Sequence, residues 1–286
     1  MWRNKPINLQ QTRTHLRGAL TNGACESPGD TSLILLQHAL NRPKSWILSH
    51  GDYSLNQQEN HTLQTSLSRI LQGVPLPYVL GSWDFYGRTF HITPDVLIPR
   101  PETELLVEHA LNYAGAFQLP LIIDVGTGSG AIAVSLAAEL PGARILGVDL
   151  SLAALRVAQA NAQRLCPSRV SFCQADLLKP FSTQFDLICA NLPYIPRQEL
   201  AHLAVSHWEP QLALDGGESG LDLIRTLLKQ AQIRLSPSGV ILLETQSTLG
   251  AETLAAAQAA FPHAQHQLIH DLAGLDRMVV IHQGKS

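Results

Sequence analysis

The stretch IIDVGTGSG, residues 122–130, runs from an apolar segment directly into a glycine-rich turn, and a helical pattern begins after it at Ala131. Gly126, Gly128 and Gly130 permit a tight turn and let backbone N–H groups approach a ligand, while the following helix offers its positive N-terminus. The stretch also satisfies the dinucleotide fingerprint G-x-G-x-x-G/A. It therefore predicts a strand, a nucleotide-binding turn and a helix without choosing the ligand.

Beyond residue 100, strand-like and helical patterns alternate along the chain. The strand-like runs are 121–125, 145–148, 170–173, 185–189 and 240–243, with a final pair near 266–269 and 278–281. Helical patterns lie at 131–140, 151–165 (with Ser151 as the expected N-cap), 221–235 and 251–261. Such alternation requires right-handed crossovers, so we predict an α/β fold with a Rossmann-like, mostly parallel sheet of seven strands.

Two segments precede this region. Apolar residues recur at helical spacing up to about residue 72, with turn-rich breaks at TNGACESPGD and HGDYS, which indicates a small helical bundle. The next segment is rich in Pro, Gly and aromatic residues, and WDFYGRTFHI, centred on Gly87, suggests a β-hairpin. We expect an N-terminal helical domain at 1–74, a hairpin and linker at 75–100, and the α/β domain at 101–286.

The charge balance restricts the class of partner. The chain has 286 residues, 45% of them hydrophobic and 15% charged, with a net charge of -3. A protein held on nucleic acid mainly by phosphate neutralisation carries an excess of Lys and Arg, which this chain lacks. The start, MWRNKPINLQ, has no apolar stretch of the kind a signal peptide needs, and no apolar run is long enough to span a bilayer. We expect a soluble, unprocessed, cytoplasmic protein that makes no membrane contact.

Cysteine and histidine spacing gives no sign of a metal site. The four cysteines (Cys25, Cys166, Cys173, Cys189) have no CxxC spacing, and Cys173 and Cys189 lie inside apolar strand patterns. We interpret them as reduced core thiols. The 12 histidines show no HExxH or similar ligand spacing. We therefore expect no metal.

Polar residues follow the successive predicted strands. Asp149 ends the second strand about twenty residues beyond the glycine loop, where a carboxylate accepts hydrogen bonds from ribose hydroxyls. Asp176 and Leu177 follow the third strand, and Asn191 follows the fourth. Ligands of open α/β sheets bind at the carboxyl ends of the strands, so these residues should converge with the glycine loop.

Asp124, inside the first strand, favours S-adenosylmethionine (AdoMet) over NAD as the ligand. A carboxylate behind the glycine loop orders that loop and attracts the cationic half of AdoMet. A dinucleotide would bring a pyrophosphate to the same place, and a carboxylate would repel it.

The fourth strand is followed by ANLPYIP, residues 190–196. With the glycine loop, Asp149 and NLPY in this order, the region resembles the class I AdoMet-dependent methyltransferases that act on a planar exocyclic or amide nitrogen. Their fourth strand ends in (N/D)-P-P-Y or N-L-P-Y. Three further stretches are similar to the PrmC/HemK family of release factor glutamine N5-methyltransferases: PLPYVLGSWDFYGRTFHITPDVLIPRPETELLVE (75–108), LALDGGESGLDLIRTLL (212–228) and HDLAGLDRMVVI (270–281).

This resemblance implies a substrate and roles for the site residues. The substrate is the glutamine of the Gly-Gly-Gln tip of class I release factors, which implies a protein partner that docks on the N-terminal domain. By matching motif, the glycine loop holds the methionine part of AdoMet, Asp149 holds the ribose, and Asp176 with Leu177 borders the adenine. The loop residues are Gly126, Thr127, Gly128, Ser129 and Gly130, and the glutamine is received by Asn191, Leu192, Pro193 and Tyr194, with Asn191 also close to the transferring methyl group.

The chemistry explains why an amide-binding turn is needed. An amide nitrogen is a poor nucleophile because its lone pair is delocalised into the carbonyl. Two acceptors in the plane of the amide, for which Asn191 Oδ1 and the backbone C=O of Leu192 are candidates, take its two N–H donors and aim the lone pair at the methyl donor. Pro193 stiffens the turn, and Tyr194 offers a ring face for a flat amide. The family most often has Pro where this chain has Leu192, and Leu does not fix φ.

Several other polar residues have two possible roles. Arg100 and Glu102, in IPRPETE, pair with each other or shape the cofactor pocket. Glu104 is either a helix charge or a lid contact. Glu244, at the end of the run ILLE, lies at a strand carboxyl end but is expected to be structural.

Three alternative functions stay open at this point. A nucleic acid (rRNA or DNA) adenine N6-methyltransferase would present an extruded base to the same NLPY pocket, since rRNA adenine dimethyltransferases share that spelling. The missing basic excess and the helical domain favour a protein substrate instead, so we expect no direct nucleic acid binding. We also expect a monomer. A non-catalytic AdoMet-fold module would have an eroded glycine loop or NLPY set, and both are intact. An NAD oxidoreductase lacks a hydride-transfer constellation here.

Overall fold

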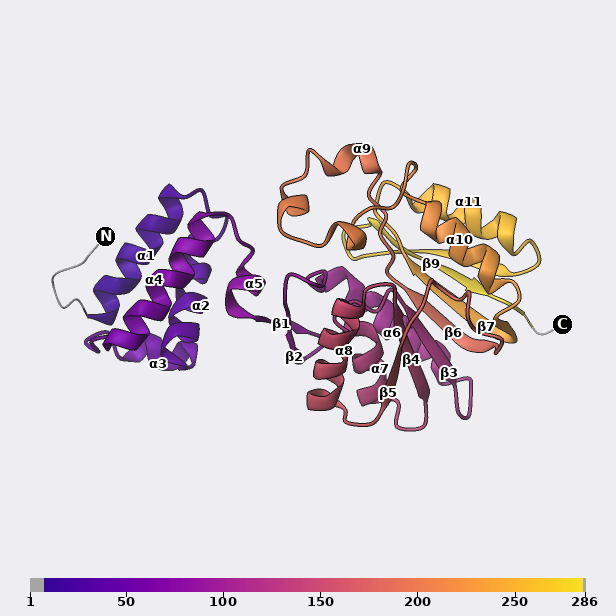
Figure 1. The fold of residues 1–286 in the computed structure, drawn as a ribbon, viewed down its shortest axis with the longest axis horizontal. Helices are drawn as coiled ribbons and strands as arrows, with labels where there is room; N and C mark the ends of the chain where they lie inside the picture. The colour runs from indigo at the N-terminus through magenta and orange to yellow at the C-terminus, as the bar shows by residue number, and fades with distance from the viewer. Residues whose placement is uncertain (1–7, 285–286) are drawn as a thin grey trace. The chain divides into compact units, whose positions relative to one another are not determined.

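The structure is a computed structural model that describes residues 8–284. The chain divides into two compact units, Met1–Gly81 and Ser82–Ser286, and each is described by itself (Figure 1). The hairpin region therefore belongs to the second unit, while the short helix before it belongs to the first.

The first unit is helical, as the apolar spacing predicts. It contains α1 (Leu9–Asn22), α2 (Pro28–Leu40), α3 (Lys44–Ser49), α4 (Gln57–Leu71) and α5 (Leu76–Leu80). Capping boxes begin α1 at Asn8 and α4 at Asn56, where each N-cap amide accepts the N3 backbone N–H. The apolar stripe of α1 packs on α2, and α2 packs on α4. The core of this bundle is built from Leu16, Leu20, Leu35, Leu36 and Leu63.

The second unit opens with the expected hairpin, β1 (Ser82–Phe85) and β2 (Arg88–His91). Its two turn residues, Tyr86 and Gly87, both have positive φ, +48° and +68°, which is the conformation of a type I′ hairpin turn. The Tyr86 N–H donates to Glu104 Oε1 at 2.8 Å. Glu104 thus ties the turn to the start of the first helix of this unit.

The main sheet confirms the predicted Rossmann-like arrangement. Its seven strands are in the order β5-β4-β3-β6-β7-β9-β8, and all pairs are parallel except those that β9 makes. The chain winds from β3 outward to β5 and then returns to β6, so the junction of β3 and β6 is the topological switch point. The strands are β3 (Leu121–Val125), β4 (Arg144–Asp149), β5 (Val170–Gln174), β6 (Phe185–Ala190), β7 (Leu235–Glu244), β8 (Gln265–His270) and β9 (Asp276–His282).

Helices cover both faces of the sheet. The crossovers through α7 and α8 run one way along the sheet and the crossover through α10 runs the other way, so right-handed connections place them on opposite faces (Figure 1). α6 packs on α7, and α11 packs on α10. The long helices are α6 (Glu104–Ala114), α7 (Ala131–Glu139), α8 (Leu152–Leu165), α10 (Asp222–Ala231) and α11 (Gly250–Ala260); the short ones are α9 (Arg197–Leu200), η1 (Pro101–Thr103), η2 (Ala204–His207) and η3 (Gln211–Ala213).

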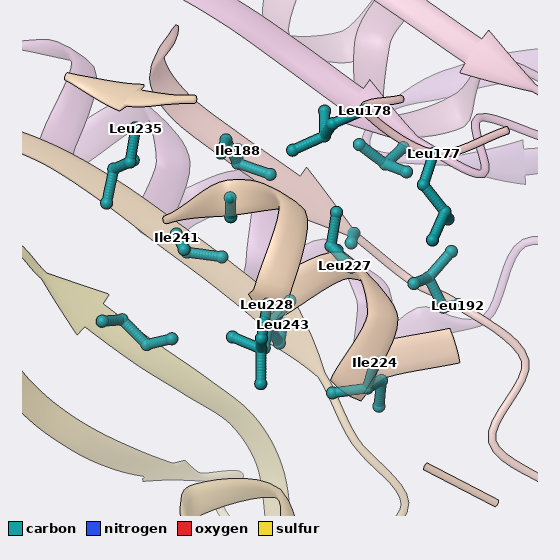
Figure 2. Packing of buried hydrophobic residues seen from close by; sticks show 14 of the residues in the cluster. Leu177, Leu178, Ile188, Leu192, Ile224, Leu227, Leu228, Leu235, Ile241 and Leu243 are labelled. Atoms are coloured by element: carbon teal, nitrogen blue, oxygen red, sulfur yellow. The ribbon is translucent and has the colours of Figure 1, made fainter. Parts of the chain in front are cut away.

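A hydrophobic core fills the space between the sheet and α10. Figure 2 shows it from close by, with Leu227 and Leu228 of α10 among side chains from β6 and β7. Two residues from beyond the strand ends, Leu177 and Leu192, belong to the same cluster. The loops at the carboxyl edge of the sheet are therefore anchored in the core.

Two sequence expectations need correction. Of the four cysteines expected in the core, Cys173 is exposed, because β5 is an edge strand, and Cys25 is only half-buried. The helix expected at 221–235 ends at Ala231, and Leu235 instead starts β7 by pairing with Phe185. The end of this helix was not predicted because the apolar pattern continues from the helix into the strand. The N-cap at Ser151 is confirmed, since its hydroxyl accepts the Ala154 N–H at 3.2 Å.

None of the helices between residues 8 and 284 combines the length and apolar character needed to cross a bilayer.

Candidate active site

A cavity lies at the carboxyl ends of β3, β4, β5 and β6 and is called here the glycine-loop cavity. This is the edge at which the sequence predicts that its polar residues converge. The predicted site residues that line the cavity are Gly126, Gly128, Asp149, Asp176, Leu177, Asn191, Leu192 and Pro193.

The glycine loop has the conformation that only glycine adopts easily. Gly126, Gly128 and Gly130 have φ values of +75°, +55° and +81°. The N–H groups of Gly126 and Thr127 donate to the Val148 carbonyl at 2.8 and 2.9 Å, which fixes the loop to β4. Gly130 also packs closely, because a Cβ there would lie 3.2 Å from Ala158 Cβ.

The other predicted loop residues do not line the glycine-loop cavity. Thr127 and Ser129 are buried, and Gly130 is the N-cap of α7. The Thr127 hydroxyl donates to Asp124 Oδ2 at 2.6 Å, and the Ser129 carbonyl accepts from the Asn161 side chain at 2.9 Å. These residues hold the loop from behind, so their side chains shape the site without facing the cavity.

Asp124 lies behind the loop, as the sequence predicts, and is fully buried. Its Oδ2 also accepts the Ala133 N–H at 3.2 Å, while Oδ1 has no hydrogen-bond partner. Burial raises the pKa of Asp124 to about 7, against the lowering effect of the Thr127 and Ala133 hydrogen bonds. The group is therefore close to its titration point at neutral pH.

Asp149 links the glycine loop to the start of α8. Its Oδ2 accepts the Gly128 N–H at 2.9 Å and its Oδ1 accepts the Ser151 N–H at 2.8 Å. Burial raises the pKa of Asp149, and these N–H groups partly oppose the shift. The Leu150 N–H also hydrogen-bonds to this carboxyl group, so three backbone N–H groups hold it at the edge of the cavity.

Sequence reasoning missed several walls of this cavity. They come from the segment after the hairpin, from the loop around η3, from the chain that follows β4 and β5, and from α10, and they are mostly apolar. Because apolar side chains carry no chemical signature, only their position in the fold identifies them. They are Asp95, Val96, Leu97, Leu150, Ser151, Ala154, Ala175, Pro210, Leu212, Ala213 and Leu223.

A second cavity, called here the tyrosine cavity, adjoins the first. Tyr194 and Arg100 line it but not the glycine-loop cavity. The segment Asn191–Pro193 lines both cavities. Together with Leu97 and Ala213, this segment forms the shared wall across which a group could pass from a ligand in one cavity to a ligand in the other.

Leu192 anchors that wall. Its side chain is only 3% exposed and lies in the core with Leu177 and Ile224 (Figure 2). A Cβ at Gly126 would stand 3.0 Å from Leu192 Cδ2, so the two loops pack tightly together. The turn is thus held by packing, which compensates for the missing φ restriction of a proline at position 192.

The stretch LDGGESG supports the backbone of the wall from the other side. Gly216 N–H donates to the Ile195 carbonyl at 2.9 Å, and the Ile195 N–H donates to the Leu214 carbonyl at 3.2 Å. A Cβ at Gly216 would lie 2.8 Å from Tyr194 Cα, and one at Gly220 would lie 2.5 Å from the Tyr194 carbonyl oxygen. Glycine is needed here for close approach to the NLPY turn.

Charged residues surround Tyr194. Burial, followed by the charge of Glu244, raises the pKa of Tyr194 to about 12, so the phenol is neutral at physiological pH. The possible pairing of Arg100 with Glu102 is wrong. Arg100 Nη2 contacts Glu209 Oε1 at 2.5 Å, whereas Glu102 Oε1 lies 3.6 Å from Arg277 Nη2. Glu209 comes from the loop before η3, where nothing in the sequence marked it.

The Asn191 side chain is held at the back of the wall. Its Nδ2 donates to Thr103 Oγ1 at 3.1 Å. Thr103 and Asn191 also hydrogen-bond to the carboxyl group of Glu244 at the end of β7. Glu244 is thus a neighbour of the predicted substrate amide site, although β6 and β7 are far apart in sequence.

The chain is similar to known methyltransferases over most of its length. Residues 121–268 match a family model described as a methyltransferase domain, and residues 11–81 match a model described as the PrmC N-terminal domain. A release factor glutamine methyltransferase of Bordetella pertussis is 40% identical over 252 residues, which cover 86% of this chain and 91% of that protein. One of Moorella thermoacetica is 38% identical over 274 residues, which cover 95% of this chain and 97% of that protein.

A solved structure shows the same fold. It is a T. thermophilus 16S rRNA N2 methyltransferase in complex with AdoMet and guanosine, with a TM-score of 0.53 and 21% identity. The match covers 71% of this chain and 50% of that one. At this identity the likeness concerns the fold alone.

Proposed function

The chain belongs to the family of release factor glutamine methyltransferases, and we propose that it methylates the side-chain amide nitrogen of the glutamine in the Gly-Gly-Gln tip of class I release factors, with AdoMet as the methyl donor. It is a methyltransferase that acts on glutamine in release factors. The Gly-Gly-Gln tip, the amide nitrogen and AdoMet are the finer parts of the proposal. The observation that carries them is the Asn191–Pro193 wall shared by the two cavities.

The glycine-loop cavity has groups that fit AdoMet. The Asp149 carboxyl group lines this cavity and is an acceptor for a ribose hydroxyl, and Leu150 and Leu177 offer apolar walls for the adenine ring. The buried Asp124 behind the loop adds negative charge on the side where the amino acid half carries its cations. When bound, AdoMet would supply an electrophilic methyl group on a sulfonium sulfur.

The tyrosine cavity suits the glutamine side chain. Asn191 Oδ1 and the Leu192 carbonyl would accept the two N–H donors of the amide, so that its lone-pair axis crosses the wall. Tyr194 would cover one face of the flat amide. The substrate nitrogen would form the N–C bond as the bond between the methyl group and the sulfonium sulfur breaks, and the nitrogen's proton would leave to water or Asn191. Catalysis is mostly alignment, because alignment replaces the entropy cost of bringing two molecules together.

The first unit is proposed to dock the release factor. The match of residues 11–81 to the PrmC N-terminal domain supports this proposal. We keep residues 1–74 as the docking domain, 75–100 as the hairpin and linker, and 101–286 as the methyltransferase domain. A cytoplasmic location, a monomeric state and the absence of direct nucleic acid binding also stay predictions.

The test is incubation of the protein with labelled AdoMet and a release factor, either wild type or with Gln→Ala in the Gly-Gly-Gln tip. Duplex DNA and rRNA are tested in parallel. We expect label only in the wild-type factor, on the glutamine amide by mass spectrometry. Label in RNA or DNA but not in the factor would overturn the proposal in favour of an adenine methyltransferase.

A further inference from the structure

Glu244 is a buried carboxyl group next to the substrate side of the site. It is only 5% exposed, at the carboxyl end of β7, beside the end of β6 where Asn191 begins the wall. Its Oε2 has no hydrogen-bond partner. Burying an incompletely paired carboxyl group costs free energy, so a purely structural role explains it poorly.

The contacts of Asn191 show what this carboxyl group could do. The Asn191 amide group directs its NH2 to Thr103 and Glu244, and no hydrogen bond among residues 8–284 is accepted by its Oδ1. An ionised carboxylate only accepts hydrogen bonds, so it selects the NH2 end of the amide. The Oδ1 end is then left for the cavity wall, where the substrate amide needs an acceptor.

We propose that Glu244 is a positioning residue that, in its ionised form and together with Thr103, holds the Asn191 amide with Oδ1 directed at the NH2 group of the substrate glutamine. The inference rests on the proposed function and adds a protonation requirement to it. A protonated Glu244 can donate a hydrogen bond and so favours Asn191 in the reversed orientation. Asn191 would then present its NH2 to the substrate NH2, and two donors cannot pair.

The groups around Glu244 determine the pH at which its carboxyl group ionises. Burial is the main cause that raises the pKa of Glu244 to about 7, and the charge of Glu102 raises it further. The hydrogen bonds from Thr103 and Asn191 and the charge of Arg277 lower it, and the Tyr194 phenol also faces it. A carboxyl group is ionised above its pKa, so turnover should be maximal above about pH 7 and fall as the pH drops through that value.

Asp124 complicates a simple pH profile, because burial also raises its pKa to about 7. Its position behind the glycine loop makes its titration act on AdoMet binding. Profiles are therefore recorded at saturating AdoMet, and Asp124→Asn is measured beside Glu244→Gln. Glutamine keeps the size of Glu244, can donate to Asn191 as the protonated carboxyl group does, and does not titrate.

The test is label transfer to the release factor from about pH 5.5 to 8.5, read as kcat. Wild type should lose up to about tenfold of its turnover per pH unit below pH 7. Glu244→Gln should abolish this acidic limb and hold turnover at pH 8.5 at least about tenfold below wild type, because glutamine mimics the protonated carboxyl group. Asp124→Asn should keep the limb. Asp186→Asn is the matched control, since that carboxylate lies at the opposite end of β6, bound to the Leu121 N–H and the Ser236 hydroxyl, and it should also keep the limb.

A second pair of variants tests the geometry without titration. Thr103→Val should lower kcat about tenfold with unchanged AdoMet affinity and melting temperature, and Thr103→Ser should restore kcat. Three results would overturn the positioning role and leave the proposed function intact. They are an acidic limb that persists in Glu244→Gln, a wild-type profile without that limb, and normal turnover in Thr103→Val. If wild type transfers no label to the factor at any pH, the proposed function fails and the inference fails with it.

Discussion

Gly126 and Leu192 pack directly against each other: a Cβ on Gly126 would stand 3.0 Å from Leu192 Cδ2. The first residue opens the loop after β3 and the second lies in the turn after β6, so this contact joins the two loops at the switch point of the sheet. It makes the shape of the glycine-loop cavity depend on the same packing that holds the NLPY turn.

Gly126→Ala should damage both loops. The added Cβ meets Leu192, and the φ of +75° disfavours any residue other than glycine, which together should destabilise the fold by about 1–3 kcal/mol and weaken AdoMet binding at least about tenfold. Thermal unfolding and calorimetric titration measure these effects. Gly87→Ala is the matched control, because Gly87 also has positive φ, +68°, but no atom within 4 Å of the new Cβ. It should leave AdoMet affinity unchanged.

Leu192→Ala should destabilise the protein by about 2–5 kcal/mol, because it leaves a cavity in the core around α10. Leu192→Met, which nearly keeps the volume, should cost less than about 1.5 kcal/mol. Chemical denaturation compares the two variants. Equal and small losses in both would show that the turn is not anchored by this side chain.

Asn191→Ala should lower turnover about 10²-fold or more while AdoMet affinity falls much less, because one preorganised acceptor for the substrate amide is lost. Steady-state kinetics and binding of AdoMet to the free enzyme separate the two effects. The control is Asn112→Ala, an exposed position on α6. Near-normal turnover in Asn191→Ala contradicts the assignment of Asn191 to the substrate site.

Gly216→Ala should impair the substrate side of the site by steric means alone. The new Cβ would lie 2.7 Å from the Gly220 carbonyl oxygen and 2.8 Å from Tyr194 Cα, so the NLPY turn must shift. A displacement of this size should lower kcat/KM for the release factor at least about tenfold, with AdoMet affinity within about twofold of wild type. Gly18→Ala, in α1 with no atom within 4 Å, should keep full activity. Loss of AdoMet binding in Gly216→Ala would refute this separation of the two cavities.

Asp124 should make stability depend on pH. Its pKa rises from 3.8 in the unfolded chain to about 7 in the folded one, so above pH 3.8 the unfolded state ionises first and this group lowers stability until about pH 7. Asp124→Asn removes this effect, and its free energy of unfolding relative to wild type should rise by roughly 2–4 kcal/mol between about pH 5 and pH 8. Denaturant unfolding at the two pH values measures the difference. A constant difference would show that Asp124 does not titrate in this range.

The sheet could be predicted because each of its strands carries a local signal. The apolar runs around Ile123 and Ile188 mark buried strands, and the three positive-φ glycines that follow Val125 mark the loop. The exposure of Cys173 could not be predicted in this way. Cys173 lies in an apolar run, yet it is exposed, because whether a strand is at the edge depends on its neighbours and not on its own residues.

The sequence by itself determined the fold class, the glycine loop, Asp149 and the NLPY turn, because these depend on residue type at short spacing. Only the tertiary structure decided which distant residues support them. Gly216, Glu209 and Glu244 reach the site from loops and a strand that follow NLPY in the chain, and Thr103 reaches it from before the sheet. Parallel strands bring their carboxyl ends to one edge whatever their separation in sequence, so contacts across that edge leave no local pattern to read.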